Sequence, residues 1–244
     1  MTDGRLKGQV ALVTGGSRGL GLAIARALAA EGASLALVAR AGAELDKAVA
    51  SLSAAGSRAV AAAADVTRAE EVERAVRSVL DRLGRLDMVI LNAGTWQGAP
   101  IHETSEAMWD QIIGLNLKGA FLALKATLPT LISQKRGTIV GISSLGGLVG
   151  QSGSAAYAAS KWGLRGLLES AALELKPHHI RVSLVYPHNI NSAGRAIDPG
   201  SEERNQALEP GDVASMVAWI CCAPGYVSVG NVSIWPIGAG ITWR

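Results

Sequence analysis

The feature that most constrains the fold is a regular alternation of short apolar runs with longer segments of helical periodicity. The apolar runs are continuous, as strands of a parallel sheet must be when both faces are buried. This alternation predicts an α/β fold of Rossmann type, a doubly wound parallel sheet of about seven strands with helices on both faces. The expected strands are 9–14, 34–40, 58–65, 86–94, 137–144, 180–187 and 231–236, and the expected helices are 19–32, 43–56, 68–84, one or two within 105–135, 154–176 and 210–222.

No linker, low-complexity stretch or internal repeat divides the 244 residues, so we expect a single domain spanning 1–244. The net charge is only +3 and no block of lysine and arginine occurs, which argues against a nucleic-acid partner. No stretch approaches the roughly 18 uncharged apolar residues of a membrane span. The short apolar run near the N-terminus indicates the first strand rather than a signal peptide.

Cys221 and Cys222 are adjacent within an apolar helical pattern, an arrangement that suits neither a disulfide nor a metal site. We interpret them as two small core residues, which fits a reducing, cytoplasmic location. The histidines His102, His178 and His179 have no ligand spacing and are expected at the surface or in turns. The sequence therefore predicts no metal centre.

A glycine-rich stretch, TGGSRGLG at 14–21, follows the first expected strand and opens the first expected helix. Glycines in such a turn allow the backbone to approach a ligand closely, and the helix N-terminus offers free N–H groups to an anion. The plain alternative is a strand-to-helix turn without a ligand. The position between a strand and a helix favours a phosphate or dinucleotide loop.

Tyr157 and Lys161, in the stretch YAASK, lie four residues apart in an expected helix, so their side chains share one face. The plain alternative is an exposed aromatic residue with a solvated lysine nearby. A neighbouring ammonium stabilises phenolate and lowers the pKa of a tyrosine, which would suit the pair to proton transfer near neutral pH.

Several motifs together resemble the short-chain dehydrogenase/reductase family in both order and interval, from about residue 6 to residue 190. They are TGGSRGLG, Asp65 in ADVT, NAG at 92–94, Asn116 in GLNLKG, ISS at 142–144 and YAASK. The resemblance implies hydride transfer between a nicotinamide dinucleotide and a carbonyl or alcohol substrate. Within the family the chain is similar to 3-oxoacyl reductases and to reductases of small ketones and aldehydes, and its C-terminal part favours the second group.

The resemblance implies a catalytic set of Asn116, Ser144, Tyr157 and Lys161. Tyr157 would give the proton, Lys161 would lower the pKa of Tyr157 and hold the nicotinamide ribose, and Ser144 would orient the substrate oxygen. Asn116 resembles the family residue that holds a helix kink and a water on a proton relay to Lys161. Ser143 is the plain alternative to Ser144, although strand alternation directs its side chain to the other side.

The second expected strand ends at Ala39 and Arg40 without an acid, and Arg18 lies inside the glycine loop. Two guanidinium groups that converge on one phosphate bind it strongly, so we predict NADP(H) rather than NAD(H). Asp65 resembles the family residue that meets the adenine amino group. The expected cofactor-binding residues are Gly15, Ser17, Arg18, Gly19, Leu20, Gly21, Arg40, Asp65, Val66, Asn92, Ala93, Gly94, Tyr157, Lys161, Pro187, Ile190 and Ser192.

The chain departs from the family pattern after the sixth strand, where His188 replaces a glycine. If that position requires positive φ, the histidine is strained there. His188 could contact the substrate or the pyrophosphate, or it could be drift at a tolerant position. A short substrate lid is expected at 192–210. The residues expected to shape an apolar substrate pocket are Trp96, Leu145, Leu148 and Trp162, with the lid.

The helices at 154–176 and 109–135 resemble the family's subunit-contact helices, so we expect a homo-oligomer, either a dimer or a tetramer. The expected partner is a small-molecule carbonyl or alcohol. An alternative function is a catalytically silent NADP(H)-binding sensor or scaffold protein. The intact Ser144, Tyr157 and Lys161 argue against it, whereas His188 and the short lid leave it open.

Overall fold

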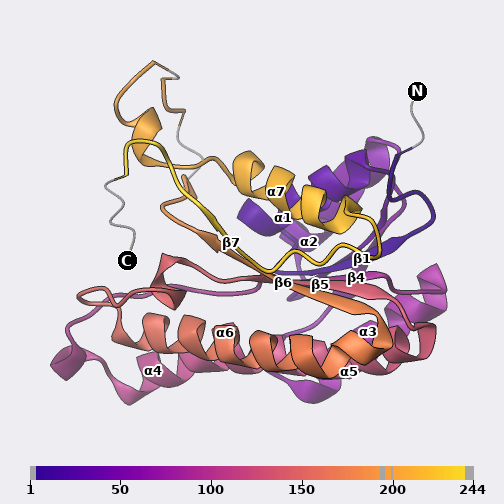
Figure 1. Cartoon of the computed structure of the whole chain (residues 1–244), viewed down its shortest axis with the longest axis horizontal. Coiled ribbons are helices and arrows are strands. Elements are labelled where there is room, and N and C mark those ends of the chain that lie inside the picture. The colour runs from indigo at the N-terminus through magenta and orange to yellow at the C-terminus, as the bar shows by residue number, and fades with distance from the viewer. Residues whose placement is uncertain (1–3, 193–195, 199, 240–244) are drawn as a thin grey trace.

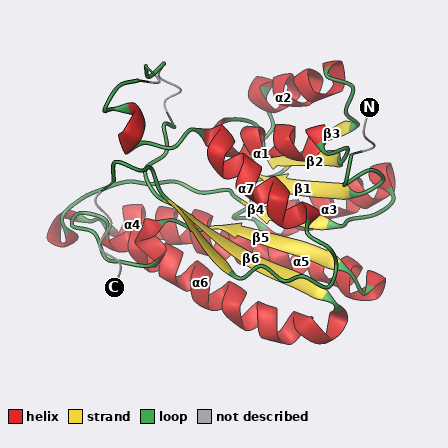
Figure 2. Ribbon diagram, turned by 45° about the horizontal axis from the view of Figure 1, so that its top comes forward, coloured by secondary structure: helices red, strands yellow, loops and turns green. Residues whose placement is uncertain are grey.

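The computed structural model describes residues 4–192, 196–198 and 200–239. These residues form a seven-stranded sheet in the order β3-β2-β1-β4-β5-β6-β7, with every neighbouring pair parallel. The predicted doubly wound fold is therefore confirmed, and Figure 2 shows the strands from β3 to β6 in this order. The strands are β1 Val10–Thr14, β2 Ser34–Ala39, β3 Ala59–Ala63, β4 Met88–Leu91, β5 Gly137–Ile142, β6 Ile180–Pro187 and β7 Asn231–Ile234.

Helices cover both faces of the sheet (Figure 1). On one face lie α1 (Gly19–Ala30), α2 (Ala43–Ala54) and α7 (Pro210–Cys222), which share one buried core with that side of the strands. On the other face α3 (Ala69–Leu83), α5 (Gly119–Gln134) and α6 (Ala155–Leu175) share a second core. The continuous apolar runs of the sequence are explained by this arrangement, because each central strand contributes side chains to both cores.

The expected helical region 105–135 is divided in the structure. It consists of α4 (Glu106–Ile113), a π-helical turn at Gly114–Lys118 and α5. The stretch Glu106–Gln134 is long and apolar enough to cross a membrane by composition alone, with a mean hydropathy of 1.2 over its best window. Because 44% of that window is buried in the protein and α5 packs on the sheet, the stretch is explained as core helix.

The site is positioned by the point where the strand order reverses. After β1 the chain continues outward through β2 and β3, and then it returns so that β4 pairs with the other side of β1. Connections from the carboxyl ends of β1 and β4 leave toward opposite faces, which opens a crevice there. The buried Thr14 joins the ends of β1 and β4 at this crevice. Its Oγ1 accepts hydrogen bonds from Asn92 N at 2.9 Å and from Ala93 N at 3.1 Å.

The predicted lid at 192–210 contains one short 3₁₀ helix, Arg204–Gln206, among its described residues. An isolated bridge between Ile190 and Leu208 attaches the lid to the end of β6. Residues 193–195 and 199, which were part of the predicted lid, lie outside the described residues.

A close contact in the core explains a glycine within β5. A Cβ added at Gly141 would overlap the Leu168 side chain of α6, so the missing side chain lets the helix lie close to the sheet. Leu168 is fully buried at 0% exposure, whereas Leu173 on the same helix is 77% exposed.

We expect Leu168→Ala to lower the free energy of unfolding by about 3 kcal/mol, because it leaves a cavity beneath β5. The matched variant Leu173→Ala removes the same atoms from the surface of α6 and should change it by less than about 0.5 kcal/mol. Urea denaturation followed by circular dichroism measures both. Equal effects of the two variants would contradict the packing described here.

Candidate active site

The glycine loop closes tightly against the start of α1. Gly15 has φ +65° and Gly19 has φ +53°, values that favour glycine. A Cβ added at Gly21 would overlap the Gly15 carbonyl oxygen, so this glycine is needed for the helix to approach the loop. The result is a cradle of backbone at the N-terminus of a helix, where an anion is stabilised by free N–H groups and by the helix dipole.

A cleft of about 1210 Å³ lies along this cradle at the strand-order reversal. It is lined by the predicted cofactor residues Gly15, Ser17, Arg18, Leu20, Gly21, Arg40, Asp65, Val66, Asn92, Ala93 and Gly94. Sequence reasoning missed other lining residues, among them Glu44, Thr67, Thr95, Asp110 and Gln111. The volume, the backbone cradle and the two arginines fit a phosphorylated nucleotide.

Both arginines of the cleft, Arg18 and Arg40, have a carboxylate nearby. Arg18 Nη1 lies 3.8 Å from Glu44 Oε1. The Asp65 carboxylate accepts hydrogen bonds from Thr67 N at 2.9 Å and from Thr67 Oγ1 at 2.7 Å. These bonds and, to a smaller extent, the nearby Arg40 guanidinium lower the pKa of Asp65, so its carboxylate is charged at neutral pH.

Tyr157 and Lys161 lie on one face of α6, as their spacing predicts. The Lys161 ammonium donates to the Ile142 carbonyl oxygen at 2.9 Å and lies 5.7 Å from the centre of the Tyr157 ring. Burial lowers the pKa of Lys161 to about 8. Burial raises the pKa of Tyr157, and hydrogen bonding with Ser144 opposes only part of that rise. The expected lowering of the tyrosine pKa by Lys161 is therefore not found, because desolvation of the phenol dominates and only Ser144 opposes it.

The structure brings Ser144 rather than Ser143 to Tyr157. Ser144 follows β5, and its Oγ accepts from Gly146 N at 3.2 Å at the start of a 3₁₀ turn, Leu145–Gly147. Ser143 is buried on the other side of the chain, and its Oγ lies where a Cβ added at Gly147 would overlap it. The alternation of side chains at the end of the strand decides between the two.

Asn116 lies in the π-helical turn between α4 and α5, and its side chain is buried. Its Oδ1 accepts from Thr95 N at 2.7 Å, and its Nδ2 donates to Thr95 O at 2.9 Å and to Ser160 Oγ at 3.0 Å. The asparagine thus fastens the chain after β4 to the residue that precedes Lys161 in α6. The extra residue in the helical turn matches the kink that the family resemblance implies for this position.

Gly94 connects the cleft with the catalytic residues. A Cβ added at Gly94 would lie 3.1 Å from Asn116 Oδ1 and 3.7 Å from Lys161 Nζ. Gly94 also lines the cleft, so one lining residue lies next to the Lys161 ammonium, whereas Lys161 and Tyr157 themselves do not line the cleft.

A sequence profile of the short chain dehydrogenase family matches residues 9–199. The chain belongs to the short-chain dehydrogenase family.

Relatives of this short-chain dehydrogenase cover nearly its whole length. An uncharacterized oxidoreductase of Listeria innocua is 34% identical, over 95% of this chain and 97% of that protein. A metagenomic short-chain oxidoreductase crystallised in complex with NADP is 41% identical, with a TM-score of 0.83 over 95% of this chain and 98% of that one. An alcohol dehydrogenase from the archaeon Thermococcus sibiricus, complexed with 5-hydroxy-NADP, is 30% identical, with a TM-score of 0.88 over 96% and 99%.

The residues predicted to shape the substrate pocket of this short-chain dehydrogenase differ in exposure and in their contacts. Trp96 is 61% exposed, and its Nε1 donates to Ser154 Oγ at 3.3 Å, just before α6. Leu145 and Leu148 are half-buried beside Ser144. Trp162 is half-exposed on α6, where the Arg165 guanidinium lies 5.6 Å from its ring centre.

His188 is not strained, since its φ is not positive. Its backbone N donates to Ile234 O at 3.0 Å, and its ring stacks on Trp235 with centroids 5.1 Å apart. Burial lowers the pKa of His188 and favours the neutral ring, whose buried Nδ1 has no hydrogen-bond partner among the described residues. The histidine therefore joins β6 to the segment after β7.

The other residues predicted near the nicotinamide lie around the end of β6. Pro187 is buried as the last residue of the strand, and Ser192 is exposed with its N donating to Ile190 O at 2.7 Å.

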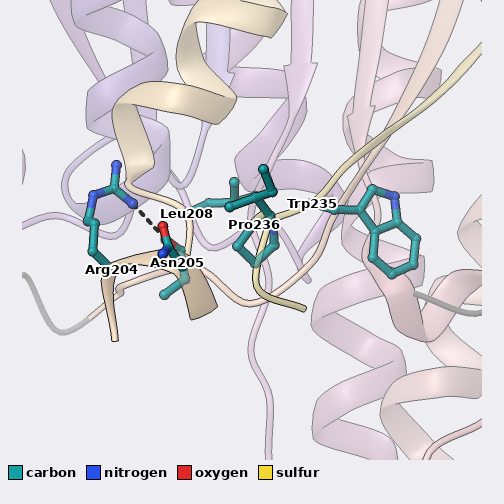
Figure 3. Close-up of a pocket in the computed structure, with 7 residues that line it drawn as sticks. Arg204, Asn205, Leu208, Trp235 and Pro236 are labelled. Atoms are coloured by element: carbon teal, nitrogen blue, oxygen red, sulfur yellow. Dashed lines mark hydrogen bonds between the residues drawn. The ribbon is translucent and has the colours of Figure 1, made fainter. Parts of the chain in front are cut away.

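A smaller pocket of about 330 Å³ separates the lid from the segment after β7. Figure 3 shows Arg204 and Trp235 at opposite sides of it. Arg204 Nη1 donates to Ala207 O at 2.8 Å, which fixes the guanidinium within the lid. The residues that line this pocket are Arg204, Asn205, Ala207, Leu208, Trp235, Pro236 and Ile237, and none of them belongs to the predicted catalytic set.

The buried Lys161 makes stability depend on pH in a defined direction. Below about pH 8 its ammonium is charged in both the folded and the unfolded chain, and folding carries the cost of desolvating it. Between that pH and the ordinary lysine value of 10.5 the unfolded chain binds more protons than the folded chain, so this cost is removed as pH rises.

We therefore compare the free energy of unfolding of Lys161→Met with that of the natural chain. The difference, variant minus natural chain, should fall by about 2 kcal/mol between pH 7 and pH 9.5. Urea denaturation at the two pH values measures the difference. Lys125→Met, which removes an exposed lysine of α5, is the control for loss of a lysine. Parallel pH curves for Lys161→Met and the natural chain would contradict the burial of a charged lysine.

Proposed function

We propose that this chain is an NADP(H)-dependent oxidoreductase that interconverts a carbonyl group and a secondary alcohol. The observation that carries the proposal is the position of the buried Lys161 ammonium. This ammonium lies 5.7 Å from the centre of the Tyr157 ring and beside Gly94, which lines the cleft that fits a phosphorylated nucleotide. Membership of the short-chain dehydrogenase family and the NADP-bound relative support the same function.

The residues that would hold the dinucleotide follow from the cleft. The backbone at 15–21 would bind the pyrophosphate. Arg18 and Arg40 would bind the adenosine 2′-phosphate, and Asp65 would accept a hydrogen bond from the adenine amino group. Asn92, Ala93 and Gly94 would line the adenosine side of the cofactor. Lys161 would bind the nicotinamide ribose. The residues expected near the nicotinamide are Pro187, Ile190 and Ser192. When bound, the dinucleotide supplies or accepts the hydride.

Tyr157 would donate the proton to the substrate oxygen during reduction. The phenol is protonated at neutral pH, so the proton is present, and the raised pKa of Tyr157 makes that phenol a weaker acid. The Ser144 hydroxyl, which bonds with Tyr157, would hold the substrate oxygen in reach of that proton. Lys161 is largely charged at pH 7, because its pKa is about 8, and it would stabilise the phenolate that remains.

The buried polar groups behind Tyr157 would hold this residue in position. Asn116 and Ser160 are joined by a hydrogen bond of 3.0 Å, and Ser160 Oγ donates to Tyr157 O at 2.7 Å. These contacts hold the turn of α6 that carries both Tyr157 and Lys161. Asn116 is therefore proposed as a positioning residue and as part of the relay to Lys161.

The substrate class is a small ketone or aldehyde, or a 3-oxoacyl compound. Leu145 follows Ser144 directly, and the exposed Trp96 is held at the start of α6 by its hydrogen bond to Ser154, so both would offer apolar surface to a substrate. The alcohol dehydrogenase from Thermococcus sibiricus, with its TM-score of 0.88, supports an alcohol or carbonyl substrate. Reduction would be the cellular direction with NADPH.

We also propose that the chain forms one domain over 1–244 and assembles into a dimer or a tetramer. Phe121 of α5, Trp109 of α4 and Trp162 of α6 are each more than 40% exposed, which supports assembly through this helical layer. Cys221 and Cys222 are free, which suits the reducing cytoplasm.

We expect Tyr157→Phe to lower NADPH-dependent carbonyl reduction by at least about a hundredfold, because it removes the proton donor. The Kd for NADPH should change by less than about twofold, since the ring and Lys161 remain. The assay follows NADPH consumption against small ketones, aldehydes, diketones, quinones and a 3-oxoacyl thioester.

Tyr226→Phe, which removes a hydroxyl from a residue that is 90% exposed, is the matched control and should retain full activity. Substantial activity in Tyr157→Phe would remove this residue from the mechanism. Tight NADPH binding without turnover of any carbonyl would favour the alternative function, a silent sensor or scaffold.

Arg40→Gln should raise the Kd for NADP⁺ about tenfold and leave the Kd for NAD⁺ nearly unchanged, because it removes a charged donor for the 2′-phosphate. Arg26→Gln removes an exposed arginine of α1 that does not line the cleft, and it is the control for loss of charge. Isothermal titration calorimetry measures the constants. Equal affinity of the natural chain for the two dinucleotides would refute the predicted preference.

A further inference from the structure

The arginine of the glycine loop already has an anionic neighbour within the cleft. Glu44 lies in the first turn of α2, and its Oε1 is 3.8 Å from Arg18 Nη1. Both side chains line the cleft, and both are well exposed to it, at 77% for Arg18 and 66% for Glu44. The pair therefore stands at the mouth of the region proposed to receive the adenosine 2′-phosphate.

The position of Glu44 makes the pairing more than a chance surface contact. A carboxylate in the first turn of a helix interacts favourably with the positive end of the helix dipole, which favours an acid at the position of Glu44 beside the cleft. Arg40, the other arginine of this region, lies four residues before Glu44, and the Asp65 carboxylate lies near Arg40. The two arginines thus face two carboxylates, and the region is much less cationic than its arginines alone suggest.

A 2′-phosphate that binds Arg18 has to displace Glu44 from it. The phosphate and the carboxylate carry charge of the same sign, so they compete for one guanidinium and repel one another at short distance. A ribose with a free 2′-hydroxyl meets neither effect. Because an exposed ion pair is weak, the 2′-phosphate still binds Arg18. The difference in affinity between the phosphorylated and the unphosphorylated cofactor is then smaller than it would be without Glu44.

We propose that Glu44 is a specificity-determining residue that competes with the 2′-phosphate for Arg18 and thereby limits the preference for NADP(H) over NAD(H). The proposal rests on the proposed function, since it requires a dinucleotide in this cleft. It goes further in assigning a role to a residue outside the glycine loop and outside the end of β2. Removal of the Glu44 charge should therefore sharpen the preference for the phosphorylated cofactor.

The test is Glu44→Gln, with adenosine 2′,5′-bisphosphate and AMP as probes that differ only in the 2′-phosphate. Calorimetric titration should show the Kd for the bisphosphate falling about three- to tenfold in the variant, and the Kd for AMP staying within about twofold. Asp46→Asn is the matched control, since Asp46 is an exposed acid in the same helical turn that does not line the cleft. It should leave both constants within about twofold.

A second pair of variants tests whether Glu44 acts through Arg18. In an Arg18→Gln background the gain from Glu44→Gln should shrink to less than about twofold, because no guanidinium remains to be released. A full gain in that background would overturn the proposed competition. An unchanged Kd for the bisphosphate in Glu44→Gln, with the natural chain binding both probes, would overturn this inference alone. Failure of the natural chain to bind either probe or NADP⁺ would overturn the proposed function together with it.

Discussion

The pairing of β1 with β2 on one side and β4 on the other is the constraint on which the site depends. It sends the connections that follow the two strands to opposite faces, so a cleft opens where they part. Thr14 links the end of β1 to the end of β4 at this cleft. Its hydroxyl accepts hydrogen bonds from two backbone N–H groups that follow β4 and donates one to Ile90 O at 3.2 Å. The glycine loop, the arginines and Gly94 acquire their positions from this one junction.

Burial shifts the pKa values of the two proposed catalytic groups, Lys161 and Tyr157, in opposite directions. It lowers the pKa of Lys161 to about 8 and raises the pKa of Tyr157. Each shift favours the neutral form, yet at pH 7 the lysine is still mostly charged while the phenol is firmly protonated. In the proposed mechanism the protonated phenol of Tyr157 would be the donor, and the nearby cation would stabilise the phenolate. The same desolvation makes Lys161 a cost to stability, which links the chemistry of the site to the energetics of the fold.

Much of the site could be predicted from the sequence because its groups are local in the chain. The face shared by Tyr157 and Lys161 follows from helical spacing, and the alternation of side chains at the end of β5 places Ser144 rather than Ser143 at Tyr157. Asn116 was predicted at a helix kink, although the π-helical turn that forms the kink was not. Glu44 and Thr67 were missed, since nothing in their local sequence shows that they reach the cleft. Trp162 was predicted to shape the substrate pocket, and in the structure the Arg165 guanidinium lies 5.6 Å from its ring centre.

The sequence by itself determined the strand and helix alternation, the glycine cradle and the residue types of the catalytic set, because each depends on spacing within a short segment. Only the tertiary structure decided the balance of charges in the cleft and the protonation of the catalytic pair. Both depend on distances between segments far apart in the chain, such as Arg18 with Glu44 and Lys161 with Ile142. Both also depend on how far each group is removed from water, and a linear sequence carries neither quantity.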